Sequence, residues 1–327
     1  MVNQMRTFLA FILLGGIAAA PATAREMAMR VFEINDHVLA YYDGRPPEPK
    51  VHPGAEDWAE TGAYNVGVCT YVIHQGHDAL VYDTYPDVRD AQWVRHDLAR
   101  RGVTHITMVN SHWHLDHVGG NAVYADVDRI ATVRTIEMLR EKQAAIESGT
   151  LWGPPAIQPL VIPNVGISHD TAVWVGTLQV LLKPVNIHSA DGLVIVIPGD
   201  RLLLAGDTLE DTVTFVSEPE HMAEHIRNLE SMKGWNIERI LPNHGDPKRI
   251  SSGGYTPTLI DATVAYLTKL QVRVGEARDL TGSLEDYVSE SVARGWVSVW
   301  WAYRDAHAEN MKRVAAVALK AGTGEAP

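Results

Sequence analysis

The sequence of 327 residues predicts a mixed α/β (α+β) domain in which two sheets are flanked by helices. Short apolar segments of strand length come in two runs, and segments with helical periodicity follow each run. Hydrophobic residues make up 46% of the chain, which is enough for a packed core. No linker-like or low-complexity segment separates two cores. We therefore expect one domain over residues 25–327, with a helical extension over about residues 256–321.

The first 24 residues are typical of a signal peptide. Residues 8–20 are apolar, Arg6 is the only charge before Arg25, and Ala22-Thr23-Ala24 has the small-x-small pattern of a signal peptidase site. The alternative is a retained membrane anchor. The apolar run argues against it, because it is shorter than the about 20 residues that span a bilayer. We expect export to the periplasm or the medium, with no membrane anchor after cleavage. A chain with 1 Cys and no internal disulfide fits such an oxidising compartment.

The first run of strands follows the signal peptide. Asn35-Asp36 between the first two apolar segments is typical of a hairpin turn. Gly102 marks the end of a segment whose apolar residues recur at helical spacing. The expected elements are a hairpin of residues 30–34 and 37–42, a hairpin of residues 67–74 and 78–83, a helix over 87–101, strands over 105–110 and 129–133, and a helix over 135–145.

The second run begins after a loop rich in proline. Its expected elements are strands over residues 171–175, 179–183, 193–197 and 201–205, a helix over 219–233, a strand over 239–241, and helices almost throughout from 256 to 321. Two connecting segments, residues 43–65 and 148–163, are predicted loops. Each carries a tryptophan, Trp58 or Trp152, and is either a flap over a site or an ordinary surface loop. The aromatic residues of the C-terminal helices are expected mainly in the core; they are Trp296, Trp300, Trp301 and Tyr303.

The composition excludes several classes of protein. With 28 Lys+Arg against 40 Asp+Glu, the net charge is −12, which argues against nucleic acid as a partner because phosphate binding needs clustered cations. A single cysteine excludes a disulfide framework and a cysteine-rich zinc module. The count of 15 histidines is unusual, and the positions of these residues in the sequence decide how it is interpreted.

The histidines concentrate in the segment Ser-His-Trp-His-Leu-Asp-His-Val-Gly-Gly, which directly follows the strand predicted to end at residue 110. His112 and His114 are two residues apart, so in an extended chain their imidazoles point the same way. Asp116 and His117 come in the following turn and reach a neighbouring point. Imidazole and carboxylate groups are the usual nitrogen and oxygen ligands of zinc and iron. The segment therefore predicts a metal site.

Three further segments carry single ligand-type residues at strand ends. His188 lies between two predicted strands, Asp207 comes just after a buried strand, and His244 follows another strand. Each residue alone is weak evidence, because such positions are often structural or part of a turn. Their order after the histidine-rich segment makes the set specific.

This ordered pattern resembles the metallo-β-lactamase superfamily over about residues 66–246. The resemblance implies an αββα sandwich with the metal site at one edge, between the sheets. By this resemblance His112, His114 and His188 would hold one metal ion, Asp116, His117 and His244 would hold a second, Asp207 would bridge both, and Asp83 would support the ligands from behind.

Departures from the family's subtypes narrow the resemblance. One major type of zinc β-lactamase has cysteine where Asp207 stands, so the site resembles the binuclear hydrolases that include glyoxalase II and the lactonases. Lactonases that open acyl-homoserine lactones have a tyrosine shortly after this aspartate, whereas Thr208, Leu209 and Glu210 follow here. His114 takes the place of the glutamate found in the flavo-diiron branch, which argues against that branch.

The resemblance implies an exported metal-dependent hydrolase with two Zn²⁺, or with iron or manganese in their place. A metal-bound hydroxide would attack the carbonyl of an ester, lactone, thioester or amide, a β-lactam included, in a small-molecule substrate. Asp116 and Asp207 are the expected catalytic carboxylates. The alternatives are an iron-dependent oxidoreductase similar to persulfide dioxygenases, a phosphodiesterase, and a non-catalytic binding module. The bond cleaved and the oligomeric state stay open.

Overall fold

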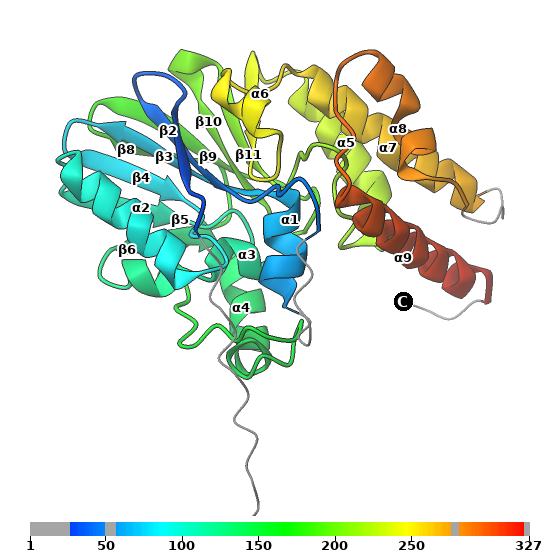
Figure 1. Ribbon diagram of the computed structural model, residues 1–327, viewed down its shortest axis with the longest axis horizontal. Coiled ribbons are helices and arrows are strands. Elements are labelled where there is room, and N and C mark those ends of the chain that lie inside the picture. Colours follow the sequence, from blue (N-terminus) through cyan, green and yellow to red (C-terminus); the bar gives the residue numbers. More distant parts are fainter. Residues whose placement is uncertain (1–26, 50–56, 276–280, 324–327) are drawn as a thin grey trace, which may run out of the picture.

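The computed structural model describes residues 27–49, 57–275 and 281–323. The predicted signal peptide, residues 1–24, lies outside the described residues. Two sheets stack face to face with helices on their outer sides, as the sequence predicts (Figure 1). No helix of the described part of the chain is long and apolar enough to cross a membrane.

The first sheet has seven strands in chain order within the described residues. β1 to β4 pair antiparallel, and β4 to β7 pair parallel. β7 is not among the predicted strands, because its three residues include Gly166 and are largely exposed. The strands are β1 (Arg30–Glu33), β2 (Val38–Asp43), β3 (Val68–Gln75), β4 (Asp78–Tyr82), β5 (His105–Val109), β6 (Asp128–Thr132) and β7 (Val165–Ile167).

The second sheet has five strands in the order β12-β11-β10-β9-β8. All pairs are antiparallel except β11 and β12, which run parallel. The strands are β8 (Thr171–Val175), β9 (Leu178–Pro184), β10 (Leu193–Ile197), β11 (Leu202–Gly206) and β12 (Arg239–Pro242). Every residue of β10 and β11 is buried, so these strands are apolar throughout and do not alternate.

Alternating side chains of β2 show how the layers are held together. Ala40 and Tyr42 pack into the core between the two sheets, whereas Leu39 and Tyr41 pack into a second core on the outer face of the first sheet. That outer core includes α2 (Val88–Arg100), whose N-cap is the predicted start of the helix. Because successive side chains of β2 point to opposite faces, this strand contacts both the helix layer and the second sheet.

The segment of residues 43–65, predicted as a loop, is partly helical. A π-helix, Ala59–Ala63, continues into α1 (Tyr64–Val66). Ala59, Ala63 and Tyr64 share one side of this turn and are buried in the outer core. The burial of these side chains outweighs the proline and glycine content that predicts a loop.

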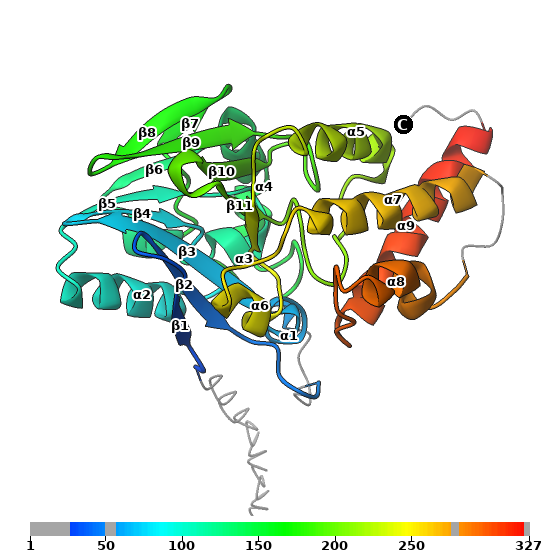
Figure 2. The same cartoon turned by 90° about the horizontal axis from the view of Figure 1, so that it is seen from above.

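The remaining helices lie on both outer sides and at one end of the sandwich. α3 (Leu115–Val118) and α4 (Val133–Glu147) belong to the first half of the chain, and α5 (Met222–Met232), α6 (Pro247–Ser251), α7 (Thr258–Gly275), α8 (Leu284–Ala293) and α9 (Tyr303–Thr323) to the second. α5, α7, α8 and α9 pack together and project from one end of the sheets (Figure 2).

The C-terminal region departs from helix between α8 and α9. The helices predicted almost throughout from 256 to 321 are present as α7, α8 and α9, and residues 294–302 form a break between the last two. Ser298 donates its backbone N–H to the buried carboxylate of Asp211 at 2.9 Å, and Trp300 donates its backbone N–H to Thr212 at 2.9 Å. These side chains replace the hydrogen bonds of a helix and hold the extended segment against the second half of the sandwich.

Candidate metal centre

The site lies at the edge where parallel strands end. β4 runs parallel to β5, and β11 runs parallel to β12, so the carboxyl ends of each pair lie together. Asp83 follows β4, His112 follows β5, Asp207 follows β11 and His244 follows β12. Strand ends of this kind form the crevice in which open α/β sheets bind ligands.

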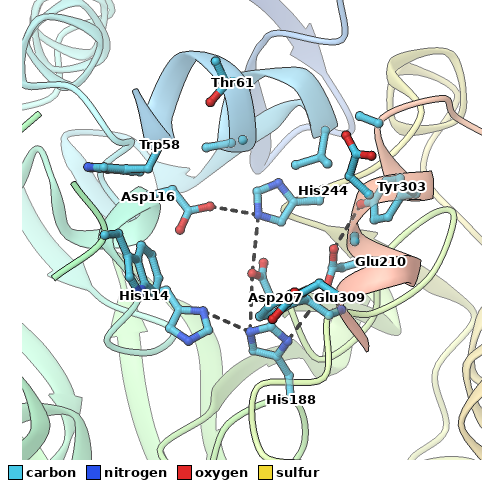
Figure 3. A pocket seen from close by; sticks show the side chains of 18 of the residues that line it. Trp58, Thr61, His114, Asp116, His188, Asp207, Glu210, His244, Tyr303 and Glu309 are labelled. Carbon is cyan, nitrogen blue, oxygen red and sulfur yellow. Dashed lines mark hydrogen bonds and ion pairs between the residues drawn. The ribbon is translucent and has the colours of Figure 1, made fainter. Parts of the chain in front are cut away.

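The first cluster consists of His112, His114, His188 and Asp207, all buried. His114 Nδ1 lies 3.1 Å from His188 Nε2. Asp207 Oδ2 lies 3.6 Å from His112 Nε2 and 3.7 Å from His188 Nε2. One nitrogen or oxygen of each residue thus faces a common point, as Figure 3 shows for His114, His188 and Asp207.

The second cluster consists of Asp116, His117, Asp207 and His244. Asp207 Oδ2 lies 3.1 Å from His117 Nε2 and 3.4 Å from His244 Nε2. His244 Nε2 lies 3.2 Å from Asp116 Oδ2. Asp207 belongs to both clusters, so a single carboxylate joins them, in the arrangement that the resemblance implies.

The donor atoms of both clusters fit divalent cations. Ligands about 2.0–2.2 Å from a tetrahedral zinc ion lie about 3.4 Å from one another, and the separations above run from 3.1 to 3.7 Å. His112 Nε2 and Asp207 Oδ1 are buried without a hydrogen-bond partner, which is rare unless another group serves them. Nitrogen and oxygen donors suit zinc, iron and manganese. Each cluster therefore offers a set of residues that could hold a metal ion.

Asp83 lies directly behind the second cluster, where the resemblance places it. Its Oδ2 accepts hydrogen bonds from His117 Nδ1 at 2.9 Å and from Asn243 Nδ2 at 2.5 Å, and its Oδ1 accepts one from the Ser111 N–H at 2.7 Å. The bond to Nδ1 turns His117 Nε2 towards the centre. In the same way His244 Nδ1 donates to the carbonyl of Gly67 at 2.5 Å.

Asp191 is a buried carboxyl group that the sequence analysis did not single out. Its Oδ2 accepts the Trp113 N–H at 2.9 Å, and Ser189 donates to its Oδ1. These bonds tie the loop that carries His188 to the segment between His112 and His114. Burial raises the pKa of Asp191 to about 6. Its position three residues after His188 is the only sequence signal that could have indicated it.

Glycines allow the metal-binding segments to lie close together. Gly206 has φ +54°, and a Cβ there would come within 2.9 Å of Ser111 Cβ and of the Tyr82 hydroxyl. A Cβ at Gly120 would come within 2.1 Å of the Thr84 carbonyl oxygen. The Gly-Gly pair after the histidine-rich segment is thus required by the close approach of two backbones.

The charges of the two clusters differ. Burial and the neighbouring imidazoles lower the pKa of His112 and of His114 well below the usual value, so both are neutral, the form that binds metal. Burial also opposes charge on His244, but the Asp207 carboxylate outweighs it and raises the pKa of His244 well above the usual value. The second cluster thus stabilises positive charge at its centre.

A family model of the metallo-β-lactamase superfamily matches residues 64–244. The chain belongs to the metallo-β-lactamase superfamily. The Caenorhabditis elegans protein named "Beta-lactamase-like protein 2 homolog" is 26% identical over 264 residues, which are 80% of this chain and 81% of that protein. The Drosophila melanogaster protein of the same name is 25% identical over 188 residues, which are 55% of this chain and 59% of that one.

Solved structures share the fold of this chain. VMB-1 superimposes with a TM-score of 0.56 at 16% identity, over 74% of this chain and 98% of that chain. The metallo-β-lactamase from Pontibacter korlensis gives a TM-score of 0.54 at 16% identity, over 73% of this chain and 99% of that chain. The superfamily match ends at residue 244, so α7, α8 and α9 lie outside it.

In the present protein, a cavity of about 420 Å³ is lined by residues of both clusters. Trp58 and Trp152 line it, so both segments predicted as loops contribute to the site, as the flap interpretation expects. Tyr303 is buried in the core and Trp296 and Trp300 pack against it, as the sequence predicts. Tyr303 also lines the cavity, and so does Trp301, which is not among the core residues. α9 begins at Tyr303, whose side chain lies in the cavity wall (Figure 3).

Glu210 lies between the first cluster and α9. Its Oε2 accepts the Tyr303 hydroxyl at 3.0 Å, its Oε1 accepts the Phe215 N–H at 2.9 Å, and Oε1 lies 3.8 Å from His188 Nδ1. Burial and the Asp207 carboxylate raise the pKa of Glu210 to about 8. From the sequence, Glu210 is one of three residues that follow Asp207 where lactonases have a tyrosine. In the structure it lies in the cavity wall.

Proposed function

We propose that this protein is an exported, metal-dependent hydrolase that cleaves an ester, lactone, thioester or amide bond of a small molecule. The observation that carries the proposal is one shared carboxylate, Asp207, joining two donor clusters at the floor of an apolar cavity. Members of the superfamily are mostly hydrolases. Two metal ions, with zinc as the first choice, fit the two donor sets.

Some residues of the site would hold the metal ions, and others would act on the water and the substrate. Two divalent cations held by these clusters would polarise a carbonyl and lower the pKa of a bound water. Asp207 is 5% exposed and joins the two clusters, whereas the Asp116 side chain belongs to one cluster and is 14% exposed; both line the cavity. Asp116 therefore orients the attacking water and accepts its proton at the carboxylate. The aromatic wall binds the substrate and excludes bulk water.

Metal analysis coupled to a substrate screen tests the proposal. The purified protein is assayed with a β-lactam, an acyl lactone, a thioester and a phosphodiester, before and after treatment with a chelator. We expect about two metal ions per chain and chelator-sensitive hydrolysis of at least one carbonyl substrate. Less than about one ion per chain, with hydrolysis unaffected by chelation, would contradict the proposal. Iron with oxygen uptake on a persulfide would support the oxidoreductase alternative instead.

Export is the part of the proposal that rests on the sequence alone. The apolar residues 8–20 and the Ala22-Thr23-Ala24 site support cleavage before Arg25. The mass of the protein recovered from the periplasmic fraction or the medium tests it, with a chain that begins at Arg25 as the expected result. Recovery of the uncleaved chain in the membrane fraction would favour a retained anchor.

A further inference from the structure

We propose that the cavity takes an uncharged, apolar acyl group and disfavours substrates that carry a second anionic group away from the scissile bond. This inference rests on the proposed function and names the substrate class of the same site. Two features of the cavity wall support it, the aromatic side chains and the distribution of charge.

Aromatic side chains line the cavity, and two of them, Trp58 and Tyr303, lie on opposite sides of the clusters (Figure 3). Trp152 lies with its ring centroid 5.3 Å from that of His114 and 6.2 Å from that of Trp58. Phe215, Trp301 and Tyr303 belong to the side formed with α9. The Trp58 and Trp301 indole N–H groups both donate to backbone carbonyls, those of Pro155 and Pro46, so their ring faces are left for apolar contact.

The charged side chains of the wall are mainly acidic. Besides the clusters, the acidic side chains of Asp305 and Glu309 line the cavity. Arg313 is the only Lys or Arg among the described lining residues. Its Nε donates to Glu309 Oε1 at 3.1 Å, and its guanidinium lies 4.8 Å from the centre of the Phe215 ring. The one guanidinium of the wall is thus already engaged by a carboxylate.

A substrate carboxylate beyond the reacting carbonyl would meet this wall without a free cation. It would face the carboxylates of Glu309 and Asp305, which lie at the solvent-accessible part of the wall, and like charges at close range repel each other. An alkyl or aryl group at the same place gains from contact with the indole rings. The competing arrangement is one in which Arg313 leaves Glu309 and receives the substrate carboxylate.

A matched pair of substrates tests the inference on the metal-loaded protein. p-Nitrophenyl hexanoate and the mono-p-nitrophenyl ester of adipic acid have acyl chains of equal length and differ by a terminal carboxylate. We expect kcat/KM for the hexanoate to exceed that for the adipate monoester by at least about tenfold, because the carboxylate loses apolar contact and is repelled by the acidic side chains. Equal values, or a preference for the adipate monoester, would overturn the inference.

Two variants separate the roles of Glu309 and Arg313. In Glu309→Gln the guanidinium loses its partner, so we expect the preference for hexanoate over the adipate monoester to narrow several-fold. Glu290→Gln, at an exposed pair with Arg294 on α8, is the control and should leave the preference unchanged. If Arg313→Gln in the otherwise native protein selectively lowers turnover of the adipate monoester, Arg313 receives the carboxylate and the inference is wrong.

Binding of the products distinguishes this inference from the proposed function. Hexanoate and adipate share the carboxylate that a metal centre attracts and differ only at the far end. Quenching of tryptophan fluorescence, or calorimetry, should show tighter binding of hexanoate. If no ester is cleaved but hexanoate binds more tightly, the proposed function fails and the inference stands. If esters are cleaved but adipate binds as tightly as hexanoate, the inference alone fails. If neither binds, the cavity does not take an apolar acyl group.

Discussion

The floor and the wall of the cavity are built by different parts of the chain. The floor consists of the two clusters, whose residues follow the ends of β5, β11 and β12 or lie in the loop before β10. The wall comes from the π-helical turn at residues 59–63, from the segment around Trp152 and from the start of α9. The superfamily match covers every donor of the floor and ends before α9.

The difference teaches which part of the site carries the chemistry and which carries selectivity. Donors at strand ends are positioned by the backbone of two sheets, so they depend on the fold as a whole. Wall residues are positioned by packing of segments that lie outside the strands. Changes in the floor should therefore alter metal binding, whereas changes in the wall should alter the preference for substrates with metal binding intact.

Removal of the carboxylate shared by the two clusters should have the largest effect. In Asp207→Ala both donor sets lose one ligand, so we expect kcat/KM to fall by more than about 100-fold, beyond the loss typical of an outer-shell group. Metal content should fall with it, as measured by mass spectrometry of the dialysed protein. Asp128→Ala, at an exposed position of β6, is the control and should change neither quantity. Turnover that survives Asp207→Ala would refute the assignment of the floor.

The next effect should come from Asp83, which touches the floor only through His117. Asp83→Asn keeps the size of the side chain and removes the charge that orients His117 Nδ1. We expect metal affinity to fall by about 10- to 100-fold, measured by competition with a chromophoric chelator. Asp87→Asn, at the N-cap of α2, is a matched control because asparagine also caps helices. An affinity equal to that of the native protein would reduce Asp83 to a packing role.

The floor could be predicted from the sequence more fully than the wall, for a physical reason. Four donors of the floor lie within six residues of the sequence, namely His112, His114, Asp116 and His117. Imidazole and carboxylate groups at that spacing are typical of metal ligands. The groups behind them, such as Asn243 and the Gly67 carbonyl, are of common types and could not be recognised by identity alone.

The wall depends on contacts between distant segments. The Trp301 indole donates to the Pro46 carbonyl across 255 residues, and no local pattern encodes such a pair. The same holds for the helical turn at Trp58, which forms because its apolar side chains find partners on the first sheet. Strand positions were predictable because hydrophobic periodicity is local; the segments that close the cavity follow from tertiary packing.

A change in the wall should leave the metal in place. Trp152→Ala removes an aromatic face beside His114, and we expect kcat/KM for apolar esters to fall by about tenfold, mainly through KM. Metal content should match that of the native protein. Trp174→Ala is the control, since Trp174 is 63% exposed on β8 and does not line the cavity. Loss of metal in Trp152→Ala would show that floor and wall are not separable.

The last effect is one on stability and leaves catalysis aside; it concerns Asp191, which joins the His188 loop to the histidine-rich segment without belonging to either cluster. Its pKa is about 6 in the folded protein against 3.8 for the ordinary side chain, so the folded state favours the protonated form. The native protein should therefore gain stability relative to Asp191→Asn as the pH falls from about 7 to about 4. The gain is at most about 3 kcal/mol, since one pKa unit is worth about 1.4 kcal/mol.

Urea unfolding of both proteins at several pH values measures this difference directly. Below pH 3.8 the carboxyl group is protonated in both states, so the difference should level off there. Because asparagine retains a carbonyl that can accept the Trp113 N–H, the comparison isolates the charge from the hydrogen bond. A difference that grows with rising pH would mean that the carboxylate is stabilised in the fold. In that case the hydrogen bonds of Asp191 that connect the two histidine segments would require the charged carboxylate and not the neutral carboxyl group.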